Sequence, residues 1–160
     1  MRNILAAAIA SFILLQSVSA HPAVSNEVPG NVSSAFSSKF PEGDLMKWES
    51  RKGGYVAHFK KDGKKHHAYY SQEGQWKGTE TSIRRTRHLP APVQMAWKHS
   101  GYHDWYVHNI RRIETPERQL YVLHLNDGGM LVGGNRYDGS KEDHVLYFTR
   151  DGQLVKAEMI

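Results

Sequence analysis

Apolar residues recur at the spacing of an α-helix in two short segments, residues 28–36 and 89–97. Both segments read apolar-Pro-x-x-Val-x-x-Ala-aromatic, so the Val, Ala and aromatic side chains share one helical face. Proline stands near the start of each segment, where its missing backbone N–H costs a helix little. We therefore predict two amphipathic helices of about three turns each. The first should end before Pro41.

Alternation of apolar and polar positions follows each predicted helix and indicates β-strands. Residues 55–59 (Tyr-Val-Ala-His-Phe) correspond to residues 121–125 (Tyr-Val-Leu-His-Leu), and a turn containing Asp-Gly follows both. Farther along, residues 69–75 correspond to residues 147–153, again with glycine at the turn. Glycine readily adopts the positive φ that tight hairpin turns need. The sequence thus predicts two copies of one unit, a helix followed by a meander of three strands.

The same alternation assigns the two faces of the predicted sheet. The more apolar set should pack beneath the helices: Tyr55, Ala57, Phe59, Ala68, Tyr70, Tyr121, Leu123, Leu125, Leu146 and Phe148, joined by Trp48, Trp76 and Leu154. An antiparallel sheet with helices on one face leaves its other face open to water. The open face should carry the interleaved set: Val56, His58, His67, Tyr69, Val122, His124, Val145 and Tyr147. The predicted fold class is α+β, with one antiparallel sheet and the helices packed on one face.

The second copy is longer than the first. Gly63 and His66 are three residues apart, whereas the corresponding Gly128 and His144 are sixteen apart. We predict an inserted loop at about 129–143, and such loops are frequent sites of specific function. The expected organisation is a linker at 21–27, a first repeat at 28–83, a linker at 84–88 and a second repeat at 89–160.

The first twenty residues have the three parts of a secretory signal. Arg2 supplies a positive charge, residues 4–15 are apolar, and residues 18–20 read Val-Ser-Ala. We expect cleavage after Ala20 and release of a soluble protein into a periplasm or the medium. The apolar run of about 12 residues is shorter than the roughly 20 that a membrane span needs. Since the chain has no cysteine to carry a lipid, we expect no membrane anchor after cleavage.

Composition narrows the choice of partner and of stabilising interactions. The net charge is +5, and part of it lies in short runs such as Lys64-Lys65 and Arg84-Arg85. Such runs can keep sheet edges from pairing, or contact an anionic partner such as nucleic acid, lipopolysaccharide or an acidic protein. Export argues against nucleic acid. The lack of cysteine leaves stability to packing and hydrogen bonds.

No catalytic motif is present in the sequence. It lacks a nucleophile elbow, a Cys–His pair, a phosphate loop and a dinucleotide fingerprint, so we predict neither an enzyme nor a cofactor. Glu80 and Glu158 occupy equivalent repeat positions, which indicates a shared structural role. The ten histidines are unusual. An alternative function is therefore zinc or copper binding in the envelope, with His58, His66, His67 and His124 as ligands.

Taken together, these motifs resemble the PepSY-like family, whose fold is similar to that of β-lactamase inhibitor protein. The resemblance rests on Val-Pro-x-x-Val-x-x-Ala-Phe-x-x-x-Phe-Pro at 28–41, then Trp48-Glu49, Tyr55-x-Ala57-x-Phe59, Asp62-Gly63, Tyr70, Gly74 and Trp76. It covers about 28–160 and implies an exported protein with tandem units joined in one curved sheet flanked by helices. Gly101-Tyr102 departs from the Phe-Pro expected at the end of the second helix.

The open face and the resemblance together predict a function. Tyrosine and histidine among aliphatic neighbours are typical of protein-binding surfaces. We expect a monomeric, non-catalytic protein that binds another exported or envelope protein through the eight residues of the open face. The family names imply inhibition of an extracytoplasmic peptidase or β-lactamase-like enzyme.

Overall fold

The structure is a computed structural model that describes residues 28–127, 131–132, 135–136 and 143–160. The predicted signal peptide (1–20), the linker 21–27 and most of the predicted insertion at about 129–143 lie outside the described residues. Within the described part, neither helix combines the length and the apolar character that crossing a membrane requires.

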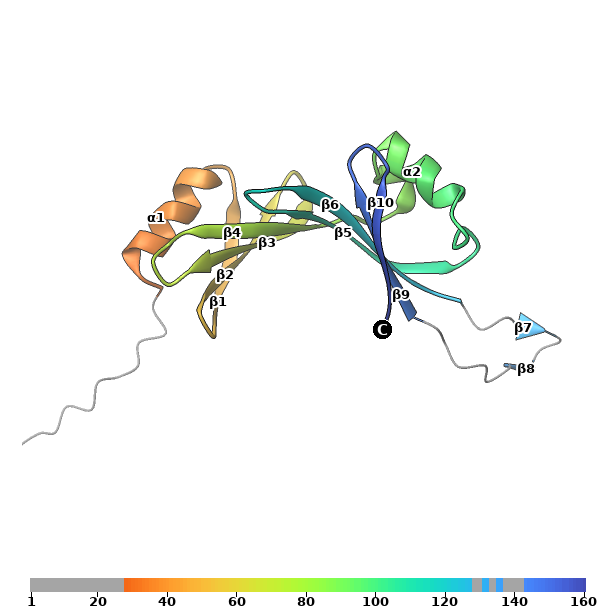
Figure 1. Ribbon diagram of the computed structural model, residues 1–160. Coiled ribbons are helices and arrows are strands. Elements are labelled where there is room, and N and C mark those ends of the chain that lie inside the picture. The colour runs from red at the N-terminus through yellow and green to blue at the C-terminus, as the bar shows by residue number, and fades with distance from the viewer. Residues whose placement is uncertain (1–27, 128–130, 133–134, 137–142) are drawn as a thin grey trace, which may run out of the picture.

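The described residues form two α-helices and one eight-stranded antiparallel sheet (Figure 1). The first half contains α1 (Gly30–Lys39), β1 (Asp44–Arg51), β2 (Gly54–Lys61), β3 (Lys64–Ser71) and β4 (Trp76–Ser82). The second contains a 3-10 turn (Thr86–His88), α2 (Ala91–Lys98), β5 (Tyr106–Glu114), β6 (Gln119–Asn126), β9 (Asp143–Thr149) and β10 (Leu154–Met159). Between β6 and β9 in the chain, β7 (Leu131–Val132) and β8 (Asn135–Arg136) form a separate two-stranded pair.

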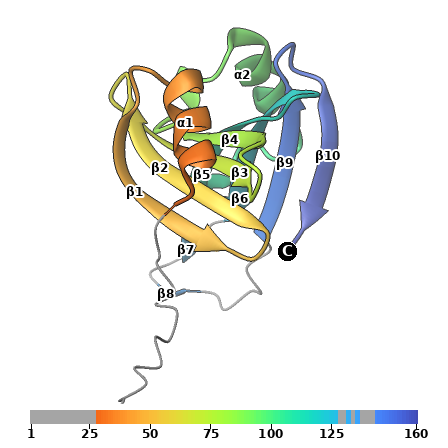
Figure 2. The same cartoon turned by 90° about the vertical axis from the view of Figure 1, so that its left-hand side faces the viewer.

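The strand order in the sheet is β1-β2-β3-β4-β5-β6-β9-β10, so neighbours in the sheet are also successive in the chain. Figure 2 shows the curvature of the sheet, with its edge strands β1 and β10 on opposite sides of the view. Each helix is followed by four strands of this sheet, where three were predicted. In the first half the extra strand is β1, which is hard to read from sequence because it is an edge strand whose residues are exposed or half-buried throughout.

The first half has its own apolar core. Val32 and Phe36 of α1 are buried against Ala57 and Phe59 of β2, together with Ala68 and Tyr70 of β3. The rings of Phe36 and Phe59 meet edge to face at 5.1 Å between centroids. Proline at the start of α1 and the end of the helix at Lys39, before Pro41, agree with the sequence prediction.

The second half has a separate core. Leu89, just before α2, and Val93 of α2 are buried with a larger set from the strands: Ile110, Tyr121, Leu123, Leu125, Leu146 and Phe148. The two clusters share no residue. Figure 1 shows α1 near one end of the sheet and α2 near the other, so each helix covers only part of it.

Candidate functional site

The face of the sheet turned away from these two cores carries the predicted binding residues, and we call it the His–Tyr face. The register places its members as direct cross-strand neighbours: Val56 with Tyr69, His58 with His67, Val122 with Tyr147, and His124 with Val145. Strands β4 and β5 separate the first two pairs from the last two. The structure therefore brings the eight residues together as two groups of four.

The eight residues differ in accessibility. Val56, Val122 and Val145 are only 1–3% exposed. Val122 and Val145 form a small cluster with Leu120, against which Tyr147 packs. The three valines are therefore buried beneath neighbouring side chains and offer almost no surface to a partner. His58, His67, Tyr69, His124 and Tyr147 are half-buried and present its contact atoms.

A carboxylate holds the first histidine pair at the β1 edge. Glu49 Oε2 lies 2.8 Å from His58 Nε2, and Arg51 Nε donates to Glu49 Oε1 at 2.7 Å. The His58 and His67 rings are 4.5 Å apart at their centroids. Burial, followed by the charge of His58, lowers the pKa of His67. Sequence reasoning missed Glu49 and Arg51 as site residues because it predicted no strand at β1.

An arginine joins the two groups of four. Arg111 Nη1 donates to Glu80 Oε2 at 3.0 Å, and its Nη2 lies 2.6 Å from His124 Nε2. A guanidinium can only donate, so His124 accepts through Nε2 and is neutral. Burial, followed by the neighbouring Arg111 charge, lowers the pKa of His124 and favours that form. Glu80 is also the hydrogen-bonding partner of Tyr69, so the polar contacts run from one group to the other.

The two tyrosines of the face each interact with a carboxylate. The Tyr147 hydroxyl donates to Glu158 Oε2 at 2.9 Å. Burial raises the pKa of Tyr69, and the charge of Glu80 and hydrogen bonding to it add to the effect. The equivalent carboxylates of the sequence analysis, Glu80 and Glu158, thus both hold a tyrosine of the face.

Comparison with known proteins identifies the family. Residues 53–156 match the family model described as beta-lactamase-inhibitor-like, PepSY-like, and this match spans well over half of the chain. The chain belongs to the PepSY-like family. No curated protein matches it significantly.

Solved structures of the same fold come from Bacteroides species. A DUF2874 family protein from Bacteroides ovatus is 26% identical, with a TM-score of 0.71 over 84% of this chain and 89% of that one. A BLIP-like protein from Bacteroides fragilis is 23% identical and has a TM-score of 0.72. The match covers 84% of this chain and 87% of that one. A Bacteroides eggerthii protein is 21% identical and has a TM-score of 0.70, with 84% of this chain and 90% of that one covered. Its description proposes a periplasmic location.

The histidines of this PepSY-like protein do not form the predicted metal site. His66 faces away from His58 and His67: it is 8% exposed, stacks on Phe59 and accepts a hydrogen bond from Thr81. His124 contacts Arg111 instead, on the far side of β4 and β5. Among the described residues, no three His, Cys, Asp or Glu side chains are placed to hold a metal. The structure does not bring the four histidines of that hypothesis together, because adjacent strand positions such as His66 and His67 face opposite ways.

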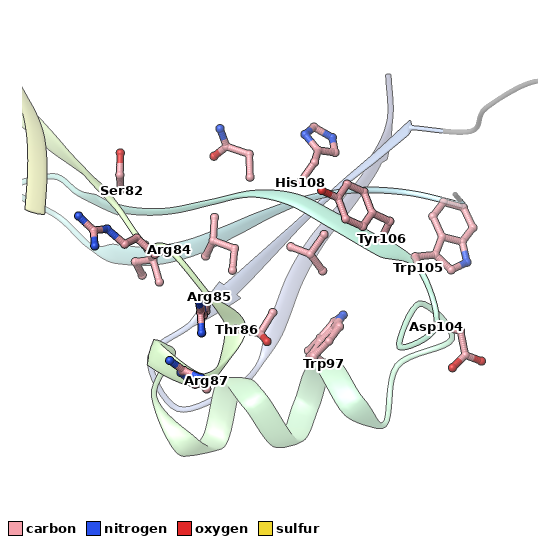
Figure 3. A pocket seen from close by; sticks show the side chains of 14 residues that line it. Ser82, Arg84, Arg85, Thr86, Arg87, Trp97, Asp104, Trp105, Tyr106 and His108 are labelled. Carbon is pink, nitrogen blue, oxygen red and sulfur yellow. The ribbon is translucent and has the colours of Figure 1, made fainter. Parts of the chain in front are cut away.

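A cleft on the helix side of the PepSY-like fold was not predicted. It has a volume of about 890 Å³ and lies between the 82–87 segment, α2 and β5 (Figure 3). Its lining combines three cations of the predicted linker with aromatic side chains: Arg84, Arg85, Arg87, Trp97, Trp105 and Tyr106. The basic run at 84–87 was the available sequence signal, but it did not show that the segment lines a cleft.

Glu49 should make the stability of the PepSY-like protein depend on pH. Hydrogen bonds from Arg51 and then His58 lower the pKa of Glu49 from 4.5 to about 2. A depressed pKa contributes stability that is complete above the unfolded value and is lost as the pH falls through the folded value. We therefore expect the stability difference between native protein and Glu49→Gln to shrink between pH 5 and pH 2. Urea unfolding across this range measures it, and a difference independent of pH would contradict the assignment.

Proposed function

We propose that this PepSY-like protein is a non-catalytic binding protein that works outside the cytoplasm and holds another exported protein on the His–Tyr face. We further propose that the partner is an extracytoplasmic enzyme of the peptidase or β-lactamase-like class, which binding inhibits. The family description and the BLIP-like structural neighbour support inhibition. The apolar segment before Ala20 and the description of the Bacteroides eggerthii neighbour support the location.

The observation that carries the proposal is the fixed polar network of the His–Tyr face. His58, His124 and Tyr147 are held by Glu49, Arg111 and Glu158, respectively. Side chains that are already ordered lose little entropy when a partner docks. Tyrosine is also enriched among the residues that dominate binding energy at interfaces.

We also propose that the two halves are copies of one unit. Three similarities support it: each half begins with a helix preceded by proline, each supplies four strands to the sheet, and each has its own core cluster. The pairing of Tyr69 with Glu80 and of Tyr147 with Glu158 repeats the same contact at equivalent positions. Two equivalent groups of four would then give the face an approximate internal repeat.

Removing three contact side chains should abolish partner capture. We expect the triple variant Tyr69→Ser, His124→Ala and Tyr147→Ser to retain about one tenth or less of the native capture, because tyrosines at interface centres carry much of the binding energy. Capture from the native secretome, followed by cross-linking and mass spectrometry, measures both the amount of partner and the residues that it touches.

The matched control is Tyr106→Ser, which removes a tyrosine that is 63% exposed and lines the cleft on the helix side. It should leave capture unchanged. Circular dichroism must show that both variants are folded. Unchanged capture of every partner by the triple variant, or cross-links confined to the helix side, would overturn the proposed face.

A further inference from the structure

The helix-side face of the sheet has a polar gap at its centre. One register row crosses it from strand to strand through Phe59, His66, Thr81, Arg112, Tyr121 and Phe148. Phe59 belongs to the core of the first half, and Tyr121 and Phe148 belong to the core of the second. The three residues between them are polar, so the row changes from apolar to polar where the two cores end.

A pocket of about 400 Å³ lies over this gap, and we call it the seam pocket. Its lining includes five basic residues, two hydroxyl residues and one acid: Lys64, Lys65, Arg84, His88, Arg112, Thr81, Ser82 and Asp62. In Figure 3 the Arg84 guanidinium lies on the Ser82 side of its segment, away from Arg87 and Trp97. A volume of this size suits a small molecule or a headgroup, since ligand pockets span roughly 300–1,000 Å³.

The charges of the seam pocket are not balanced within the protein. Among the described residues, no carboxylate forms an ion pair with Lys64, Lys65, Arg84 or Arg112. Elsewhere in the first half, Arg51 forms an ion pair with Glu49, and Lys61 forms one with Glu42. Like charges gathered around one pocket repel each other, and a bound anion relieves that repulsion.

The floor of the seam pocket is fixed by a directional chain of hydrogen bonds. Arg112 Nη2 donates to Thr81 Oγ1 at 3.3 Å, and Thr81 Oγ1 lies 3.0 Å from His66 Nδ1. His66 Nε2 in turn donates to the Lys61 carbonyl at 3.2 Å. Burial and the nearby charges of Arg112 and Lys64 lower the pKa of His66, so the histidine stays neutral and the pocket's positive charge lies on its lysines and arginines.

We propose that the seam pocket binds an oxyanion of the phosphate class, carried by a small soluble molecule or by a lipid headgroup. Arginine presents a planar fork of donors that matches two oxygens of a phosphate, and lysine adds a point charge. The hydroxyls of Thr81 and Ser82 add polar groups to the same lining. This site is on the opposite side of the sheet from the His–Tyr face, so it stands independently of the proposed protein partner.

Calorimetric titration of the purified protein with inorganic phosphate at constant ionic strength tests the site. We expect saturable binding, and each of Arg84→Gln and Lys64→Gln should weaken it about tenfold, because each removes a charge-assisted hydrogen bond. Both side chains are exposed, so their loss leaves the fold intact. Arg84→Lys should recover part of the affinity. Amide chemical shifts should move at 62–65, 81–88 and 112.

The matched control is Lys60→Gln, which removes the same charge from the same hairpin without touching the pocket lining. It should leave the affinity unchanged. No saturable phosphate binding by the native protein, or an equal loss in the control, would overturn the proposal. Two further probes identify the carrier: binding of glycerol 3-phosphate alone indicates a soluble ligand, and binding of phosphatidic-acid vesicles that phosphate displaces indicates a headgroup.

Discussion

Replacing Phe59 with alanine should lower the free energy of unfolding by about 3–5 kcal/mol, because a large buried side chain is lost and a cavity remains. Phe59 is 1% exposed and lies at the centre of the first core. Its ring is 5.1 Å from Phe36 and 4.7 Å from Phe40 at the centroids, and it stacks on His66 at 4.9 Å. Urea unfolding followed by circular dichroism measures the change.

An exposed aromatic residue gives the matched control for Phe59. Tyr106→Ala removes a ring that is 63% exposed and should change the free energy of unfolding by about 0.5 kcal/mol or less. A loss below about 1 kcal/mol for Phe59→Ala would contradict the central position of Phe59 in the core, since truncations of buried phenylalanine cost several times more.

Gly54→Ala should destabilise the protein by about 3 kcal/mol or more, although it adds a single methyl group, because overpacking forces the backbone to move. A Cβ at position 54 would lie 2.0 Å from the backbone oxygen of Tyr70 and 3.0 Å from its carbonyl carbon. Gly54 begins β2 and pairs with Ser71 at the end of β3. The contact is with backbone, so the strands must separate locally to admit the methyl group. Thermal unfolding measures the loss.

The same substitution at another glycine separates this clash from the general effect of removing glycine. At Gly30, the first residue of α1, an added Cβ meets nothing within 4 Å. Because alanine favours helices over glycine by up to about 1 kcal/mol, Gly30→Ala should be neutral or stabilising. Equal destabilisation at both positions would contradict the steric explanation for Gly54.

Alternation in the sequence predicted part of the buried side of the strands, but Leu154, assigned to the buried set, is 42% exposed, and three valines of the predicted open face (Val56, Val122 and Val145) are buried. Ala57, Phe59, Leu123 and Leu125 were assigned to one face by position alone, and all four are at most 1% exposed. A period of two leaves only two choices of face, and the apolar set selects between them. Strand β1 gave no such pattern, since it is held at the sheet edge by pairing with β2 and only its Trp48 packs against the first core, partly buried.

The polar contacts of the candidate site could be predicted only in part. The pairing of His58 with His67 follows from the hairpin of β2 and β3, whose turn at Asp62-Gly63 could be read from the sequence. The contacts of Arg111 with Glu80 and His124 depend on how β4 meets β5, strands joined through a linker and a helix with no short turn to set their register. Bulges such as the one between Val107 and Asn109 shift the register further.

The seam pocket lay beyond sequence reasoning for a different reason. Lys64 and Arg84 belong to basic runs for which an anionic partner was one of two interpretations, but Lys64, Arg84 and Arg112 come from a hairpin, a linker and the middle of a strand. Only the pairing of Thr81 with Arg112 across β4 and β5 places them around one pocket. A cluster built from such separate segments has no local motif.

The two core clusters share no residue, and this affects which substitutions the protein can accept during evolution. Substitutions at distant, independent sites have nearly additive effects on stability. A replacement in the α1 core therefore needs no compensating replacement in the α2 core. The cores at the two ends of the sheet can therefore accept replacements independently of each other.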